Sequence, residues 1–165
     1  MKLGYTIIYV PDVSASLEFF SRAFGIQQRF LHESGTYGEL ETGQTTLAFA
    51  AHELGALNFP GGHVEAHSSA KPLGFEIALV TEDVEQAHRS ALSAGAIEMA
   101  APTAKPWGQM VSYLRCPDGC VVELCTPMAG DPQRCLPAKA QGPGLAFRTV
   151  CNIANMRRKL HPGGV

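Results

Sequence analysis

Two stretches of the sequence are similar: Gly4-Tyr5-Thr6-Ile7-Ile8-Tyr9-Val10-Pro11-Asp12-Val13 and Gly74-Phe75-Glu76-Ile77-Ala78-Leu79-Val80-Thr81-Glu82-Asp83-Val84, which align at an offset of 71 residues when Asp12-Val13 is set on Asp83-Val84. Each copy is a run of β-branched and aromatic residues that ends in an acidic turn, as is typical of a β-strand. The alignment sets Tyr5 opposite Glu76. An internal repeat indicates two copies of one structural unit.

A helical pattern follows each copy of the repeat. The apolar residues that recur at three- and four-residue spacing are Val13, Leu17, Phe20 and Phe24 in the first helix and Val84, Ala87, Ala91 and Ala94 in the second. Residues at this spacing share one face of a helix. Asp12 or Ser14 can cap the first helix, and Asp83-x-x-Gln86 resembles a capping box for the second. Gly25 and Gly95 stand where a helix C-terminus favours glycine.

Three short strands are expected after each helix, separated by turns such as Ser34-Gly35 and Pro117-Asp118-Gly119. The expected strands cover residues 26–33, 37–41 and 45–52, then 96–101, 109–115 and 120–126. The sequence therefore predicts an α+β domain over residues 1–127. It would consist of two βαβββ modules, about 3–52 and 73–127, joined by a Gly- and Pro-rich crossover at 53–72.

Composition places the chain among globular proteins. Its 165 residues suit one ordinary domain, and 45% apolar with 17% charged residues suits a packed core. No apolar stretch is long enough to span a bilayer, and the first residues lead directly into a strand pattern, so we expect a cytoplasmic protein without a signal peptide. The five cysteines have no framework spacing, and Cys116-x3-Cys120 flanks a tight turn, which favours reduced thiols over a disulfide or zinc site.

The charges are divided unevenly along the chain. Residues 1–127 hold seven Lys/Arg against fourteen Asp/Glu, a net charge of −7, whereas residues 128–165 hold six against one, a net charge of +5. The acidic body offers no electrostatic footprint for nucleic acid. We expect neither nucleic acid nor a membrane as partner. Residues 128–165 read as a basic, Pro/Gly-rich tail in which 145–160 can form a short amphipathic helix.

Three motifs occur in a characteristic order along residues 3–127. They are Tyr9-Val10-Pro11-Asp12-Val13 with Phe19-Phe20 and Phe24-Gly25, then Lys105-Pro106-Trp107-Gly108-Gln109, and finally Cys116-Pro117-Asp118-Gly119-Cys120-Val121-Val122-Glu123-Leu124. With them the chain resembles the vicinal oxygen chelate superfamily, the glyoxalase, bleomycin-resistance and extradiol-dioxygenase proteins. The resemblance implies that the modules curl into half-cups, form a cupped mixed sheet and enclose a cavity. It also implies a homodimer, in which half-cups can pair across chains.

The resemblance assigns four positions on the floor of the cup. In metal-dependent members these positions, on the first and fourth strands of each module, usually carry His, Glu or Gln. Here they are Tyr5 and Ala48 in the first module and Glu76 and Glu123 in the second. Alanine offers no ligand, and a catalytic metal usually needs three protein ligands. We therefore expect no cofactor; the alternative is a divalent metal, Mg, Mn, Ni, Zn or Fe, on Glu76 and Glu123.

The predicted ligand-binding residues share polar or aromatic tips near this floor or its rim. They are Tyr5, His32, Glu76, Trp107, Tyr113 and Glu123. Glu76 and Glu123 are also the candidate catalytic residues, although either could be a structural carboxylate held by hydrogen bonds. Trp107 could stack on a ligand or plug the sheet.

Other side chains are expected to have plain structural roles. We expect Phe30 and Phe49 to pack in the core. The spacing His63-x3-His67 falls in the Gly-rich crossover, where a solvated loop is favoured over a metal site.

These observations favour a small-molecule binding protein of the glyoxalase/bleomycin-resistance type, which encloses an aromatic or cationic organic ligand such as a basic drug, as in antibiotic resistance. The alternative is a metal-dependent lyase or isomerase of the glyoxalase kind, or a dioxygenase, of the same superfamily. The sequence leaves open whether the protein is an enzyme. No nucleophile elbow, phosphate-binding loop or dinucleotide fingerprint occurs in the sequence.

Overall fold

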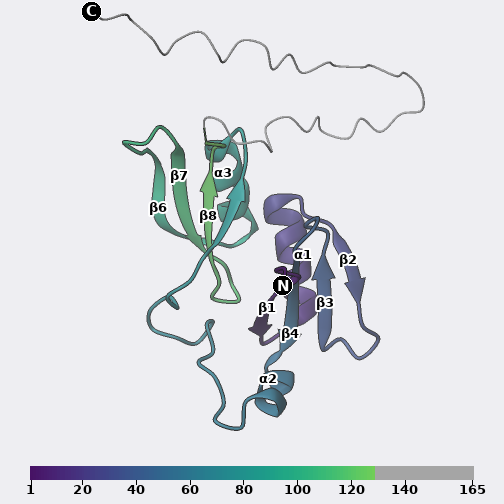
Figure 1. Ribbon diagram of the computed structural model, residues 1–165. Helices are drawn as coiled ribbons and strands as arrows, with labels where there is room; N and C mark the ends of the chain where they lie inside the picture. Colours follow the sequence, from purple (N-terminus) through teal and green to yellow (C-terminus); the bar gives the residue numbers. More distant parts are fainter. Residues whose placement is uncertain (129–165) are drawn as a thin grey trace, which may run out of the picture. The chain divides into compact units, whose positions relative to one another are not determined.

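The computed structural model describes residues 1–128, and these belong to one compact unit. The elements are β1 (Tyr5–Val10), α1 (Val13–Phe24), β2 (Gln28–Leu31), β3 (Tyr37–Leu40), β4 (Thr46–Ala51), α2 (His52–Asn58), β5 (Ile77–Val80), α3 (Val84–Ala94), β6 (Ile97–Ala104), β7 (Met110–Arg115) and β8 (Val121–Cys125). They form two four-stranded mixed sheets, in the orders β1-β4-β3-β2 and β5-β8-β7-β6 (Figure 1). The predicted α+β architecture of two βαβββ modules is confirmed.

The structure differs from the sequence prediction in the crossover. His52 begins helix α2 instead of ending a strand, and α2 occupies the start of a segment that was expected to be a loop. None of the helices in residues 1–128 is long and apolar enough to cross a membrane. The helix expected within the tail falls outside the residues that the structure describes.

Local signals account for the helix boundaries. The carboxylate of Asp12 accepts a hydrogen bond from the Ala15 amide at 2.9 Å, so Asp12 caps α1. Asp83 does the same for α3 through the Gln86 amide, also at 2.9 Å. Both helices end at a left-handed glycine, Gly25 and Gly95, as the sequence predicts.

Helix α1 is held against its sheet by the apolar face that the periodicity identified. The rings of Phe20 and Phe49 lie 5.1 Å apart between centroids, and both residues are fully buried. Leu17 packs over Gly38 of β3, where a Cβ atom would come within 2.6 Å of the leucine side chain. Helices α1 and α3 contact each other, and the buried residues of both modules form one hydrophobic cluster.

Each sheet has one packed face and one face that we call the open face. In β1, Ile8 and Val10 are buried, whereas Tyr5 and Ile7 are 55% and 46% exposed. This alternation follows the two-residue period of a strand. Among the described residues, no further strand pairs with the outer edge of β1 or of β5. Each module therefore presents an open face beside an unpaired edge strand.

The crossover is attached to the second module at its β7–β8 turn. Gly119 in that turn has φ 87° and lies against the backbone of Ala66, so close that a Cβ atom would meet the Ala66 carbonyl carbon at 2.2 Å. The guanidinium of Arg115 donates hydrogen bonds to the carbonyl oxygens of Ala66 and Ser69, both at 2.7 Å. A side chain at position 119 would therefore displace the crossover.

We expect Gly119→Ala to destabilise the protein by about 2–4 kcal/mol, because the substitution adds a steric clash to the cost of positive φ. Gly43→Ala is the matched control, since Gly43 has nearly the same φ of 84° but open space around it. It should cost about 1 kcal/mol. Urea unfolding of both variants measures the difference, and equal losses would contradict the proposed contact.

Candidate functional site

Three predicted site residues meet on the open face of the second module. Tyr113 lies directly opposite Glu123 on neighbouring strands, and hydrogen bonding to Glu123, followed by burial, raises the pKa of Tyr113 to about 12. Partial burial of the Glu76 carboxyl group, then the negative charge of Glu123, raises the pKa of Glu76. The floor of this module is therefore an acidic pair with a phenol beside it.

A surface hollow of about 430 Å³ lies over this floor. Its polar members are Glu76 and Tyr113. Its other lining residues are Pro72, Leu73, Gly74, Phe75, Met99 and Val121. The ammonium group of Lys105 lies 5.7 Å from the centroid of the Tyr113 ring, so one cation is already placed over this aromatic ring. An apolar wall with a few polar groups at its base is the usual composition of a small-molecule site.

Trp107 lies in the turn between β6 and β7 and is 60% exposed. Its indole N–H donates to the side-chain oxygen of Gln109 at 2.9 Å, and Gln109 in turn donates to the carbonyl of Thr126 at 2.7 Å. These bonds fix the edge of the ring and leave much of it accessible. In this chain Trp107 is thus not a plug packed over the sheet.

The open face of the first module carries a network that the sequence reasoning missed. The guanidinium of Arg29 donates to Glu39 at 3.0 Å and to the hydroxyl of Thr46 at 3.0 Å. The Tyr37 hydroxyl donates to the other carboxylate oxygen of Glu39 at 3.0 Å. Burial, followed by this bond, raises the pKa of Tyr37 to about 12. Tyr5 lies on the same face of the sheet.

The sequence predicts one part of this network but not its pairing with Arg29. The alternation in 37–41 predicts that Tyr37 and Glu39 share a face of β3. Their partner Arg29 comes from β2, and the β2–β3 pairing contains a register shift between Gln28 and Phe30. A bulge of this kind changes which residues lie opposite each other, so the pairing could not be read from the sequence.

Four other residues from the sequence analysis have clear positions. Ala48 is fully buried on β4, between Ile7 of β1 and Glu39 of β3. His32 is exposed in the β2–β3 connection, where its Nδ1 atom lies 2.7 Å from the Ser34 hydroxyl, and it is not brought together with the other candidates. Phe49 is buried as predicted, but the prediction for Phe30 is wrong, since 45% of it is exposed at the edge of the sheet.

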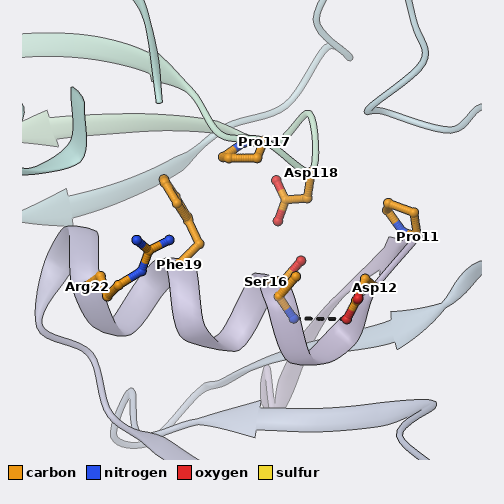
Figure 2. Close-up of a pocket in the computed structure, with 8 residues that line it drawn as sticks. Pro11, Asp12, Ser16, Phe19, Arg22, Pro117 and Asp118 are labelled. Atoms are coloured by element: carbon orange, nitrogen blue, oxygen red, sulfur yellow. Dashed lines mark hydrogen bonds between the residues drawn. The ribbon is translucent and has the colours of Figure 1, made fainter. Parts of the chain in front are cut away.

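A second cavity, of about 200 Å³, lies between the start of α1 and the β7–β8 turn (Figure 2). Its walls include Phe19, Arg22 and Pro117, and Ser16 and Asp118 point into it. One oxygen of the buried Asp118 accepts from the Cys120 amide at 2.9 Å. Burial raises the pKa of Asp118, while hydrogen bonds from the Cys120 amide and from Ser16 act against that rise. The carboxyl group thus braces its own turn.

The cysteines of the described residues are core side chains. Cys116, Cys120 and Cys125 are free and buried. Burial raises the pKa of the Cys116 and Cys120 thiols, which keeps them protonated and poor metal ligands. This agrees with the expectation of reduced structural thiols.

Two βαβββ modules with polar groups at the base of their open faces define a class of small proteins built from paired half-cups. Residues 3–129 match the family model of the glyoxalase-like domain. The chain therefore belongs to the glyoxalase-like family of the vicinal oxygen chelate superfamily, as the sequence motifs indicated.

Solved structures show the same fold. A glyoxalase/bleomycin resistance protein/dioxygenase family enzyme from Burkholderia phytofirmans PsJN has 23% identity over 76% of this chain and 98% of its own, with a TM-score of 0.63. A glyoxalase-related enzyme from Fulvimarina pelagi has 18% identity over 79% and 94%, with a TM-score of 0.66. TioX from Micromonospora sp. ML1 has 16% identity over 76% and 98%, with a TM-score of 0.56. No curated protein matches the chain. At these identities the likeness shows the fold alone.

The raised pKa of Glu76 predicts a pH dependence of stability. The folded protein holds this proton more tightly than the unfolded chain, so Glu76 costs stability as the pH rises above its ordinary value of 4.5. We expect Glu76→Gln to remove that cost. Its melting temperature should equal that of the parent near pH 4 and exceed it near pH 7, by a margin that grows between the two.

Thermal melts from about pH 4 to about pH 8 measure this margin. Glu82→Gln, which removes the same charge from an exposed turn before α3, is the matched control. A margin that is constant over the whole range for Glu76→Gln would show that the raised pKa has no role in stability.

Proposed function

We propose that this protein binds an aromatic or cationic organic molecule in the cup of the glyoxalase/bleomycin-resistance fold, without a metal ion in that cup. The observation that carries the proposal is the pair Glu76 and Tyr113 in a partly apolar hollow, with the carboxyl group of Glu123 next to both of them. A carboxylate in such a place needs a compensating partner. A ligand cation would provide one and would counteract the causes that raise the pKa of Glu76.

The rest of the molecule supports a ligand of this charge. Residues 1–127 carry a net charge of −7, and an acidic body attracts cationic molecules from a distance. Trp107 presents an accessible indole, and aromatic faces bind planar or cationic groups. The cation of Lys105 lies above Tyr113, so a ligand ammonium group would bind on the Glu76 side of the floor.

The residues on the cup floor do not fit the metal that the superfamily commonly holds there. Ala48 offers no ligand atom, and the carboxylate nearest to it along the pairing, Glu39, is occupied by Arg29 and Tyr37. A guanidinium on the same face also opposes a second cation. On the other half of the floor only Glu76 and Glu123 remain, and two carboxylates hold a hard ion weakly.

We further propose that the complete cup is formed by two copies of the chain. The open faces expose large apolar side chains, among them Tyr5, Ile7, Phe30, Ile97 and Met99. The strands beside them, β1 and β5, have unpaired edges among the described residues, and such edges invite pairing. The first module of one copy, placed against the second module of its partner, would cover both faces and join the two halves of the floor.

Binding of a planar cation tests the ligand class. Ethidium should bind, and 1-anilinonaphthalene-8-sulfonate, an aromatic anion, should bind at least about tenfold more weakly. The double variant Glu76→Gln/Glu123→Gln should weaken ethidium binding about tenfold or more, because both carboxylates are lost. Fluorescence titration of each dye gives the dissociation constants, and bleomycin can be tested as a competitor.

Controls separate a specific site from general attraction to acidic protein. Glu82→Gln/Glu85→Gln removes two exposed charges beside α3 and should leave ethidium binding within about twofold. Trp107→Ala should weaken binding by roughly 3- to 30-fold, whereas Trp107→Phe keeps an aromatic face and should lose less. Preference for the anion, or equal losses in both double variants, would overturn the proposed ligand class.

The assembly is tested separately by mass in solution. Light scattering should give about 35 kDa, twice the 17.6 kDa of one chain. Ile7→Lys places a charge on the open face beside the β1 edge and should shift the mass toward one chain. Leu57→Lys, at an 80% exposed position on α2, is the control and should leave the mass unchanged. A parent protein of single-chain mass would contradict the two-copy cup.

A further inference from the structure

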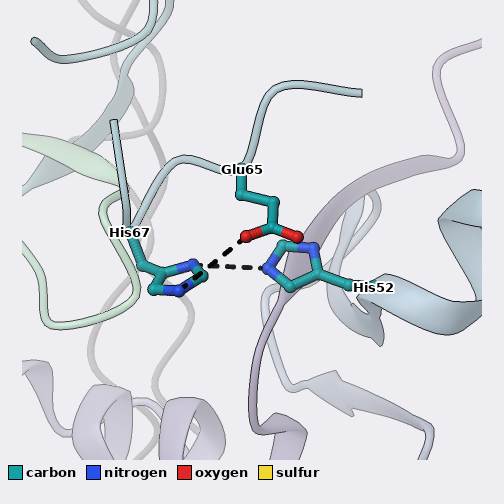
Figure 3. Close-up of side chains that lie close together, drawn as sticks. All are labelled: His52, Glu65 and His67. Carbon is teal, nitrogen blue, oxygen red and sulfur yellow. Dashed lines mark hydrogen bonds and ion pairs between the residues drawn. The ribbon is translucent and has the colours of Figure 1, made fainter. Parts of the chain in front are cut away.

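Three histidines and a glutamate converge beside helix α2, away from the cup floor. His52 is the first residue of α2, directly after β4. His63, Glu65 and His67 follow in the crossover, on a segment that returns to the start of the helix. Figure 3 shows His52, Glu65 and His67 with their polar atoms turned toward one another. The sequence had favoured a solvated loop here, because only the pair His63-x3-His67 was visible in it.

The spacing of the donor atoms suits one metal ion. One ligand atom each from His52, Glu65 and His67 lies within 4.8 Å of the other two. The Nε2 atom of His52 and the Nδ1 atom of His67 are 3.4 Å apart. Two nitrogens bound to one tetrahedral ion at about 2.0–2.1 Å lie about 3.3 Å apart. A small rotation of the exposed Glu65 side chain would bring its carboxylate to the same ion.

A fourth side chain holds His52 in the orientation that such a site needs. The Nδ1 atom of His52 lies 2.9 Å from the Nε2 atom of His63. If His52 donates its Nδ1–H in this bond, its Nε2 lone pair faces His67. Ligating histidines commonly have their second nitrogen fixed by such a partner.

His63 itself is held by close packing. Its ring lies 5.1 Å from the ring of Tyr9 and 6.3 Å from that of Phe59, centroid to centroid. It also rests on Gly55, where a Cβ atom would meet the imidazole at 2.6 Å. Gly55 is therefore the residue that lets His63 approach the helix and reach His52.

The other two ligands are held by the second module. Ala66, between Glu65 and His67, is buried and lies against Gly119. Its carbonyl accepts a hydrogen bond from Arg115. His52 thus comes from α2, and the other three side chains come from the crossover. The crossover is anchored at the β7–β8 turn. Pre-positioned ligands lose less conformational freedom when an ion binds than ligands on free loops do.

We propose that His52, Glu65 and His67 bind a divalent first-row transition ion of the zinc class, with His63 as a positioning residue. Two imidazoles and one carboxylate suit Zn²⁺ or Ni²⁺, whereas Mg²⁺ prefers oxygen ligands alone. Three protein ligands leave a position for water. The bound ion would tie α2 to the crossover, independently of ligand binding in the cup.

Equilibrium dialysis of the full chain against Zn²⁺, with elemental analysis, tests the site. We expect one equivalent of Zn²⁺ in the parent and no comparable binding of Mg²⁺. His52→Ala and His67→Ala should each weaken Zn²⁺ binding at least about tenfold, and Glu65→Gln, which preserves shape, should also weaken it. The controls His32→Ala and Glu33→Gln remove an exposed histidine and an exposed glutamate from the β2–β3 connection and should leave binding unchanged.

Further variants separate this site from others. Glu76→Gln/Glu123→Gln should keep the zinc equivalent, which distinguishes the cluster from a metal in the cup. His63→Ala should weaken binding by about 10- to 100-fold, with partial recovery in His63→Gln, because glutamine can still accept the His52 bond. Zn²⁺ should also raise the melting temperature of the parent but not of His67→Ala. Absence of zinc in the parent, or zinc retained in His52→Ala/His67→Ala, would overturn the proposal.

Discussion

The first and last strands of each module pair in parallel, and this pairing sets the positions of the helix, the sheet faces and the floor residues. Parallel strands require a long connection, which here consists of the helix and the two antiparallel strands between them. The pairing brings Ile7 beside Ala48 and Ala78 beside Glu123, so residues far apart in the chain share one sheet face. Because side chains alternate along a strand, the helix covers one face and the polar residues gather on the other.

The two modules use this common frame for different chemistry. In the second module burial, followed by the negative charge of Glu123, raises the pKa of Glu76. In the first module Ala48 has no polar side chain. Glu39, on the neighbouring strand, is paired with Arg29. One half of the floor thus holds two neighbouring acidic side chains, whereas the acidic side chain of the other half is paired with a guanidinium.

The crossover does more than connect the two modules, because it also packs against both of them. Long loops in compact domains are often functional, and this one is held at Gly119 and Arg115 of the second module and packs against Tyr9 of the first, with His63 resting on Gly55 of α2. The close approaches at both glycines fix the path of the backbone. Fixing that path brings His63, Glu65 and His67 to His52, and the same contacts fasten the crossover to both modules.

The two-module fold and the pairing of Glu76 with Glu123 could be predicted before the structure was known. The repeat, the caps at Asp12 and Asp83 and the left-handed glycines depend on local periodicity and on residues close in the chain, which is why they could be read directly. The proximity of Glu76 to Glu123 followed from the repeat and the resemblance together. Helix α2 gave no such signal, since its seven residues have no side-chain cap at the N-terminus.

The Arg29–Glu39–Tyr37 network and the grouping of His52 with His67 became visible only in the folded chain. The first depends on a register shift between strands, and the second on the path of a loop that packs against distant glycines. No sequence periodicity marks either group of residues. Both groups arise from contacts between different segments, and the separation of two segments along the chain does not give their distance in space.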